Sequence, residues 1–528
     1  MANMLQWSGH QGQLSFLHPF SLLLCFLLLF VFLFKKNRVE TKRTNLPPSP
    51  WKLPIIGNLH QLGPLPHRGL HSLAQRHGPL MLLHFGSKPT LVVSSPDAAR
   101  EIMKTHDLIF SSRPTSSFGR RLLYNHKDIG FAPYGEYWRQ VRKICVLQLL
   151  SMKRVQSFQP VREEETKVMI ENIKRSCSNS PSSSALVDLC EMLMSLTNDI
   201  ICRVALGKKY GGEEGGGRRF RKMIIEFGYL LGVFNVGDFI PWLGWVNYVL
   251  GLEERVEKNF AEIDSFLDEV IEDHIHGKRT EYVGNYNADG GDQDFVDFLL
   301  QIQQDKSAEI TLGREHIKAI VLDMFVAGTD NPQSLLEWTM ARLLKHPKVM
   351  EEVQKEVRGV AFTIGSKNIK EDDIEQMHYL KAVIKETLRM HPPAPLMVPH
   401  ESTKEAKIKG YDIPAKTTVI INAWAIGRDP ASWDDPEEFK PKRFFNDASS
   451  IDFKGHDFQL IPFGAGRRGC PGTHFAIAVV EVALANLLHK FDWALPNGAN
   501  GEALDLTESP GLSIHLKAPL LAVATPHY

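Results

Sequence analysis

The chain has 528 residues with 43% apolar side chains, enough for two or three average domains or for one large domain with a sizeable core. Its basic and acidic residues number 61 each, and the resulting zero net charge argues against a nucleic-acid partner. The six cysteines form no CxxC pair and no even spacing, which argues against a disulfide framework and favours free thiols in a reducing compartment.

The N-terminal part of the chain is predicted to be a membrane anchor. Residues 14–34 are almost wholly apolar, and an α-helix of this length spans roughly 30 Å, the thickness of one bilayer core. Basic residues begin only at Lys35, so the positive-inside rule places residues 1–13 in the lumen and the body in the cytosol. A cleaved signal peptide is the alternative, but the stretch has no basic start and no small-residue cleavage site.

Residues 35–59 are predicted to be a stop-transfer and hinge segment. Basic residues come first, and four prolines within 46–59 then stiffen the chain into an extended spacer. Residues 60–528 show no internal repeat and no second long linker, so we expect one mainly helical domain with small β-sheets, an α+β fold. The strand-like stretches are a hairpin at 80–86 and 90–95, a strand at 417–424, and two C-terminal strands at 512–516 and 520–524.

Residues 223–252 are apolar enough to suggest a second membrane span. Several glycines together with Asp238 and Pro241 argue against one continuous spanning helix. Two interpretations stay open: the segment belongs to the core, or it is an apolar element resting on the membrane surface.

Apolar residues at helical spacing predict one long helix over residues 314–344. Its interior contains Pro332, which costs roughly 3 kcal/mol relative to alanine. Pro332 has no N–H for the carbonyl of Gly328, and Asn331 lies on the apolar face of the helix. We interpret this break as a groove kept open, with the Gly328 carbonyl free to hold a water or a substrate group. The alternative is that a neighbour satisfies Asn331 and the proline merely kinks the helix.

The most specific stretch is FGAGRRGCPG, residues 463–472, which precedes a strong helical pattern. We expect Cys470 at the start of that helix, with Pro471 in the first helical position. Free N–H groups and the positive end of the helix dipole stabilise a thiolate there, which is the form that binds metal. The glycines let the backbone pass close to a large flat ligand, and Arg468 can form two hydrogen bonds with a carboxylate.

This stretch resembles the FxxGxRxCxG signature of the cytochrome P450 haem-thiolate enzymes. The resemblance covers the whole chain, and NAWAIGRDP at 422–430 is similar to the large plant A-type branch. It implies that residues 60–528 form a catalytic domain that binds haem b, with Cys470 as the axial iron ligand and Arg468 on a haem propionate. The matching residues of the signature, all expected at the cofactor, are Phe463, Gly466, Arg468, Cys470 and Gly472.

Two further segments match motifs of that family. Glu386 and Arg389 in ETLR resemble the ExxR pair, and Arg443 in PKRF stands where a later arginine joins it. On its own, such a pair is usually a surface contact of little value. The resemblance implies a Glu386–Arg389–Arg443 network that fixes the core around the haem.

Three more residues are expected at the propionates. WRQVRK, residues 138–143, resembles the WxxxR helix of the family, which implies that Trp138 and Arg142 reach the propionates. Without the resemblance, the same segment is typical of an ordinary basic helix. His400 stands where relatives often carry an arginine on a propionate. A histidine can donate there, but its charge depends on pH.

The long helix resembles the helix that covers the distal side of the haem in this family. Residues 327–330 match its pattern, but Asn331 and Pro332 depart from it, since the family usually has a threonine at the first of these positions. The threonine hydroxyl organises a water that delivers protons, whereas an asparagine forms hydrogen bonds but does not relay protons in that way. We expect Asp330, Asn331 and a water on the Gly328 carbonyl to manage protons during catalysis.

The resemblance implies a single-pass monooxygenase of the endoplasmic reticulum membrane with a cytosolic catalytic domain. NADPH-cytochrome P450 reductase would supply two electrons, docking near Arg139, Lys143 and Arg467. One atom of dioxygen would enter a small lipophilic plant specialised metabolite. The predicted substrate contacts are Phe118, Met324, Phe325, Leu396, Val398 and Pro510.

Two other functions are considered. A haem-thiolate aldoxime dehydratase or isomerase needs no oxygen insertion, and the missing distal threonine would suit it. A membrane-tethered binding protein with an inactive haem site is the third, but the intact Cys470, Arg468 and Glu386 argue against it.

Overall fold

The computed structural model describes residue 24 and residues 45–181, 183–210, 216–276, 293–305, 310–365, 367–445 and 451–527. The predicted anchor at 14–34 therefore lies outside the described residues, except for Leu24. Within the described part of the chain, no single helix is both long enough and apolar enough to cross a bilayer.

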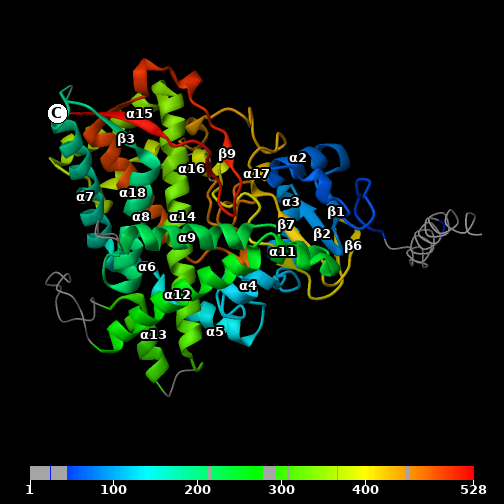
Figure 1. The fold of residues 1–528 in the computed structure, drawn as a ribbon. Helices are drawn as coiled ribbons and strands as arrows, with labels where there is room; N and C mark the ends of the chain where they lie inside the picture. The colour runs from blue at the N-terminus through cyan, green and yellow to red at the C-terminus, as the bar shows by residue number, and fades with distance from the viewer. Residues whose placement is uncertain are drawn as a thin grey trace, which may run out of the picture.

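Helices build most of the domain, and the longest of them, α14, runs through the middle of the molecule (Figure 1). The longer helices are α2 (Pro66–His77), α5 (Glu136–Ile144), α7 (Gln159–Ser178), α8 (Leu189–Leu206), α9 (Gly216–Gly232), α12 (Leu252–Ile275), α13 (Phe295–Gln304), α14 (Arg314–Lys345), α15 (Pro347–Ile364), α16 (His378–Met390) and α18 (Thr473–Lys490). The short helices are α3 (Pro96–Arg100), α4 (Ser117–Leu122), α6 (Met152–Ser157), α10 (Val236–Phe239), α11 (Trp245–Val249) and α17 (Ala423–Ile426).

The strands are short and form four small sheets. Their bounds are β1 (Leu80–Phe85), β2 (Lys88–Val93), β3 (Ala185–Asp188), β4 (His400–Glu401), β5 (Ala406–Ile408), β6 (Tyr411–Ile413), β7 (Thr418–Ile421), β8 (Phe491–Ala494), β9 (Glu508–Ser509), β10 (His515–Leu516) and β11 (Leu521–Pro526). The sheets have the orders β1-β2-β7-β4, β3-β11-β8, β9-β10 and β5-β6. The first sheet joins the N-terminal hairpin to strands more than 300 residues later, with β2 and β7 parallel. The predicted helix-rich fold with small sheets is confirmed.

Two predicted strands are shorter than expected, for identifiable reasons. The strand predicted at 417–424 ends at Ile421, because the side chain of Asn422 accepts a hydrogen bond from the N–H of Ala425 and starts the helical turn α17. In the stretch predicted at 512–516, only His515 and Leu516 pair as a strand. The two residues before them bond instead to α14 and to the segment that follows α16.

Helix α14 is one continuous helix through Pro332, as the apolar spacing predicted. It packs closely against α8: a Cβ atom placed on Gly328 would lie 2.8 Å from Cδ1 of Ile201. The surroundings of α14 are mostly apolar and buried, so the fold tolerates the proline within a helix that tertiary packing stabilises.

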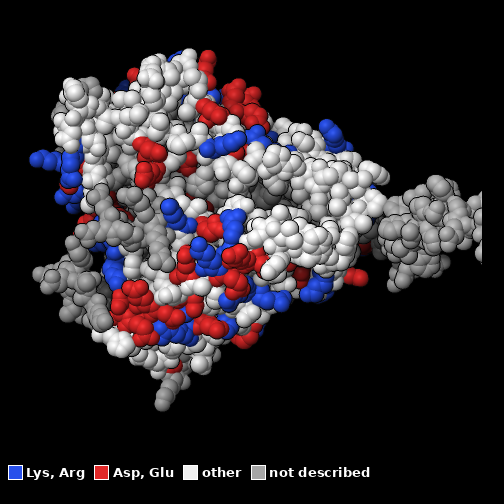
Figure 2. Space-filling model, in the orientation of Figure 1, with Lys and Arg blue, Asp and Glu red and all other residues white. Residues whose placement is uncertain are grey.

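The segment 223–252 folds as α9, α10, a 3₁₀ turn at Pro241–Leu243 and α11, with a bend of 114° between its two halves. Its inner face is buried, but the side chains of Trp242, Trp245 and Tyr248 are 63%, 62% and 77% exposed. The second half therefore lies on the surface of the domain rather than in its core. Around α11 the space-filling view shows a wide area without charged side chains (Figure 2).

Candidate functional site

The loop that carries Cys470 folds back on itself before α18 begins. The N–H of Cys470 donates to the carbonyl of Phe463 at 2.8 Å. Helix α18 begins at Thr473 with Gly472 as its N-cap, so the predicted placement of Pro471 in the first helical position is wrong. The N–H of Gly472, the N-cap of α18, has no acceptor within the helix and points at the thiol.

The surroundings of Cys470 keep its thiol protonated until a metal ion binds the sulfur and displaces the proton. Burial raises its pKa above the usual value, and the N–H of Gly472, the hydroxyl of Thr473 and the nearby Arg142 offset this only in part. The free thiol is therefore neutral at pH 7. Donors already aimed at the sulfur would stabilise a thiolate once a metal ion takes the proton.

Two glycines give the loop a shape that no other residue permits. Gly464 and Gly466 have φ angles of 70° and 67°, in the left-handed region. A Cβ atom on Gly466 would lie 2.0 Å from the carbonyl oxygen of Met103, so the loop is wedged directly against that backbone. Gly466 thus serves close backbone packing.

Among the described residues, no carboxylate lies at hydrogen-bonding distance from Arg468, which backbone carbonyls hold beside the loop. It donates to the backbone carbonyls of Ser111, Ile129 and Ala132, at 2.7, 3.3 and 2.6 Å. Its guanidinium lies 4.0 Å from the centre of the Trp138 ring. Burial lowers its pKa to about 9, even though Asp128 attracts the charge.

The half-buried Arg142 and the buried Arg113 lie in the same place. Arg142, on α5, donates to the carbonyl of Gly469 at 2.5 Å. Arg113 donates to the carbonyls of Gly130, Val398 and Pro399, and burial together with the nearby Arg468 and Arg142 lowers its pKa well below the usual value. Arg113 was missed in the sequence, where an arginine before a proline in a loop carries no signal of its own.

Trp138 and His400 lie in this region but are engaged with the backbone. The indole N–H of Trp138 donates to the carbonyl of Ile129 at 3.0 Å. The Nδ1–H of His400 donates to the carbonyl of Phe110 at 2.8 Å, and burial beside Arg113 lowers its pKa well below the usual value. The ring is therefore neutral at pH 7 with its proton on Nδ1. In this tautomer Nε2 carries no proton, and the predicted contact between His400 and a haem propionate stays a prediction.

These residues fit a haem. One cysteine offers a sulfur ligand next to a helix start, and three buried or half-buried guanidiniums donate, within the described part of the chain, to carbonyl oxygens. Burying several cations together is costly unless anions join them. The two carboxylates of a haem would supply that charge.

The Glu386–Arg389–Arg443 network is present and completely buried at its centre. Arg389 donates through two nitrogens to the Glu386 carboxylate, both at 2.8 Å, and Arg443 adds a bond of 3.1 Å. The remaining donors of Arg389 reach the carbonyls of Gly427 and Pro436 at 2.6 and 2.7 Å. The network therefore ties α16 to the segment before the cysteine loop.

On α14, Asn331 departs from the distal pattern and Asp330 follows it, and both side chains have hydrogen-bond partners. The amide of Asn331 donates to the carbonyl of Ala327 at 3.2 Å and accepts from the hydroxyl of Ser513 at 3.3 Å. Asp330 bonds to His515 at 3.1 Å. A neighbour therefore satisfies Asn331, as the second interpretation of this helix expected. Ala327 is exposed in the middle of α14, so this face of the helix is open.

The residues predicted to contact the substrate differ in how far they are exposed. Phe118, Met324 and Phe325 are buried. Phe325 lines a void of about 10 Å³ between α9, α12 and α14, so it faces the core on the opposite side of α14 from Ala327. Residues Leu396 and Val398 are half-buried, and Pro510 is exposed.

The carboxyl groups of Asp323 and Asp128 hold the loop at residues 128–132 in place. Two carbonyls of this loop, those of Ile129 and Ala132, accept hydrogen bonds from Arg468. Asp323, on α14, accepts from the N–H groups of Ile129 and Gly130 at 2.5 and 3.2 Å, and Asp128 accepts from the N–H of Phe131 at 2.5 Å. Burial and their mutual repulsion raise the pKa of Asp323 well above its usual value, and burial also raises that of Asp128. The pair therefore keeps a proton that the unfolded chain would lose.

We expect Asp323→Asn to flatten the pH dependence of stability. A raised pKa in the folded state means that folding stability falls as pH rises above the unfolded value, and the neutral amide removes this loss while its oxygen still accepts from Ile129 and Gly130. Thermal unfolding at pH 5.5 and pH 8 measures the effect, with the exposed Asp372→Asn as control. An equal decline in melting temperature in wild type and Asp323→Asn would contradict the assignment.

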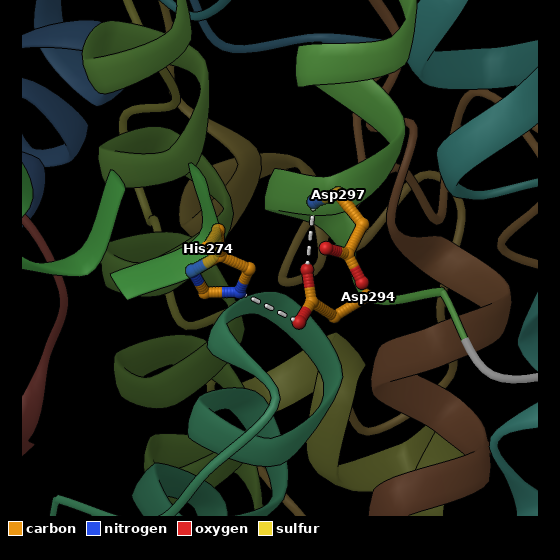
Figure 3. Close-up of side chains that lie close together, drawn as sticks. All are labelled: His274, Asp294 and Asp297. Atoms are coloured by element: carbon orange, nitrogen blue, oxygen red, sulfur yellow. Dashed lines mark hydrogen bonds and ion pairs between the residues drawn. The ribbon is translucent and has the colours of Figure 1, made fainter. Parts of the chain in front are cut away.

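A separate cluster of His274, Asp294 and Asp297 has the composition of a metal site but is explained by folding (Figure 3). His274 donates from Nδ1 to the carbonyl of Val270 at 2.6 Å, and its Nε2 lies 2.9 Å from Asp294. The other oxygen of Asp294 caps α13 at the N–H of Asp297. Burial lowers the pKa of His274, but Asp294 outweighs this and the net pKa is raised. Since both ring nitrogens are engaged, the cluster links α12 to α13.

Comparisons with known proteins agree with this site. The family model described as Cytochrome P450 matches residues 47–521. The chain is 56% identical to "Cytochrome P450 736A117" of Prunus mume, over 97% of both chains. It is 51% identical to "Norfluorocurarine oxidase" of a Strychnos species, over 94% of this chain and 96% of that one. A zebra fish cytochrome P450 structure with progesterone shares the fold with a TM-score of 0.73 at 24% identity, covering 88% of this chain and 99% of that one. The chain therefore belongs to the cytochrome P450 family of monooxygenases, in its plant A-type branch.

Proposed function

We propose that the protein is a membrane-anchored monooxygenase that oxidises a small lipophilic plant specialised metabolite, with electrons from NADPH through a reductase. The observation that carries this proposal is the cysteine loop with three arginines beside it, of which Arg113 is buried and Arg142 and Arg468 are half-buried. Each turnover would consume one dioxygen, two electrons and two protons, placing one oxygen atom in the substrate and releasing the other as water. The 51% identical relative is named as an oxidase of norfluorocurarine, which supports a plant metabolite as substrate.

Haem supplies the redox centre at which dioxygen is activated. Cys470 would hold its iron, and Arg468, Arg142 and Arg113 would hold its carboxylates in place of the carbonyls they now bond. The Glu386 network keeps α16 and the cysteine loop in a fixed relation. These residues place and charge-balance the cofactor rather than touch the substrate.

The open face of α14 would form the substrate side of the site. Ala327 presents apolar surface there beside the buried Met324, while Asp330 and Asn331 provide the polar groups. A mostly apolar wall with few polar groups suits a lipophilic molecule and fixes its orientation. The carboxylate and amide would organise the protons that the reaction consumes.

The exposed aromatic surface of α11 supports a location at the membrane. In this segment Asn235 and Asn247 are buried and hydrogen-bonded to each other at 2.6 Å, while large apolar side chains face outward. A surface with its polar residues inside and its aromatic residues outside is suited to an apolar environment. The outward-facing side chains are Trp242, Trp245, Tyr248, Val249 and Leu250.

A fluorescent label would show whether this surface contacts lipid. We expect a nitrobenzoxadiazole label on Tyr248→Cys to shift its emission to the blue when the full-length protein is placed in phosphatidylcholine vesicles, because the dye would leave water. The control is the same label on Phe362→Cys, since Phe362 is 89% exposed on α15. Equal emission from the two labels in vesicles would reject the membrane contact.

A turnover assay tests the proposed reaction. Product formation should require both NADPH with reductase and dioxygen, and label from ¹⁸O₂ should enter the product. Undiminished product without oxygen would reject the monooxygenase and support a dehydratase or isomerase instead. The candidate substrates come from binding difference spectra across a panel of plant metabolites.

A further inference from the structure

We propose that Ser513, in the turn between β9 and β10, supplies the hydroxyl that α14 lacks at position 331. The inference rests on the proposed monooxygenase function and adds a catalytic residue to it. The open face of α14 carries Ala327, Asp330 and Asn331, and none of these has a hydroxyl. A hydroxyl both donates and accepts, which an amide oxygen or a carboxylate does not.

The contacts of Ser513 place its hydroxyl between the two polar residues of that face. Its oxygen lies 3.3 Å from Oδ1 of Asn331, to which it donates, and its single proton can turn instead to the nearby carboxylate of Asp330. The amide nitrogen of Asn331 is directed to the carbonyl of Ala327, which leaves Oδ1 facing Ser513. While the hydroxyl donates to one neighbour, its lone pairs can accept from a water.

The turn that carries Ser513 is fixed to α14 at several points. The carbonyl of Ile514 accepts from the hydroxyl of Ser334 at 2.7 Å and from the indole of Trp338 at 2.9 Å. The N–H of Leu516 donates to Glu337 at 3.0 Å. The hydroxyl is therefore held in place by the same helix whose open face it completes, as a catalytic group requires.

A half-buried cation, His515, keeps Asp330 ionised beside Ser513. His515 bonds to Asp330 through Nε2 at 3.1 Å and to Glu337 through Nδ1 at 2.8 Å. Burial lowers the pKa of His515, but the two carboxylates outweigh it and raise the pKa to about 10. Burial raises the pKa of Asp330, but His515 and Ser513 outweigh it and lower the pKa. A permanently charged carboxylate thus faces the hydroxyl.

The other hydroxyls of this part of α14 do not take the same position. Thr329 is buried, and its oxygen has no hydrogen-bond partner among the described residues. Ser334 is buried and donates to Ile514. Ser513 is thus the described hydroxyl that reaches Asn331.

The proposed step is a proton transfer that leaves Ser513 unchanged. Its O–H gives a proton toward the reacting oxygen, and a water held by Asp330 returns one to the serine. Two such protons, with two electrons from NADPH through the reductase, turn one oxygen atom of dioxygen into water while the other enters the substrate. The protons originate in solvent, so the balance needs no further reactant.

Cumene hydroperoxide tests Ser513 in the haem-loaded, full-length protein without a reductase or a known substrate. Two-electron cleavage of its O–O bond yields cumyl alcohol, whereas one-electron cleavage yields acetophenone and a methyl radical. Without the relay hydroxyl, we expect Ser513→Ala to lower the alcohol-to-ketone ratio by about tenfold or more. We also expect the resting spin state, read from the Soret band, to shift, because the variant no longer orders the nearby water.

Rescue and control variants separate this role from a structural one. Ser513→Thr keeps a hydroxyl and should keep the ratio, and Asn331→Thr added to Ser513→Ala should restore both the ratio and the spin state. Thr507→Val removes an exposed hydroxyl at the base of the same turn and should change neither. The three single variants should melt within about 2 °C of wild type, since each changes the hydrogen bonds of one hydroxyl at most.

Two results would overturn the assignment. An unchanged ratio and spin state in Ser513→Ala would show that the hydroxyl is not used, and a loss that Asn331→Thr does not restore would show a structural effect. The proposed function is tested separately in the wild-type protein: it fails if product formation does not depend on NADPH and oxygen. The peroxide ratio still reports on Ser513 in that case.

Discussion

Glu386→Gln should yield a protein that folds poorly and loses haem. The variant leaves Arg389 and Arg443 as buried cations without their carboxylate, since the Glu386 and Arg389 side chains are fully buried. Breaking a buried ion pair by removing one partner costs about 3–5 kcal/mol, a large share of the stability of a typical domain. The yield of soluble haem-containing protein and its unfolding midpoint in urea measure the effect.

A neighbouring surface pair provides the matched control. Glu352 bonds to Lys442 at 2.7 Å, and Lys442 precedes Arg443 in the chain, but Glu352 is 45% exposed. Glu352→Gln should cost less than about 1 kcal/mol, because water screens and replaces that contact. Equal losses from Glu352→Gln and Glu386→Gln would show that the buried network has no special role.

Cys470→Ser should abolish oxygen-dependent turnover. A serine hydroxyl in the same loop would keep the contacts to Gly472 and Thr473 but would not replace a thiolate as an electron-donating iron ligand. The Soret spectrum of the purified variant and its turnover with reductase test this expectation. Cys177→Ser is the control, because Cys177 is buried and its side chain donates to the carbonyl of Ala524. Full turnover in Cys470→Ser would contradict the assignment of the ligand.

Much of the fold near the site was predictable because its signals are local. Apolar residues at helical spacing outweigh Pro332 and define α14 from Arg314 to Lys345. The hairpin β1–β2 follows from two β-rich runs around a glycine turn. The arrangement of Glu386, Arg389 and Arg443 required the family resemblance, since three charges in a sequence do not reveal that they are buried together.

The features that sequence reasoning missed depend on contacts between distant segments. Arg113 belongs to the basic cluster only because the loop after Asp128 and the segment around Val398 surround it. Ser513 was expected in a β-strand with His515, but the strand begins only at His515 because the preceding turn docks on α14. No local pattern encodes these pairings. The same holds for His400, whose proton goes to the carbonyl of Phe110.

The carbon monoxide difference spectrum of the reduced, purified protein tests the central claim most directly. If Cys470 binds the iron of a haem as its thiolate, the Soret band of the carbon monoxide complex will lie at the wavelength typical of thiolate-ligated haem. A band at the position typical of histidine-ligated haem, or protein that binds no haem while otherwise folded, would contradict the account.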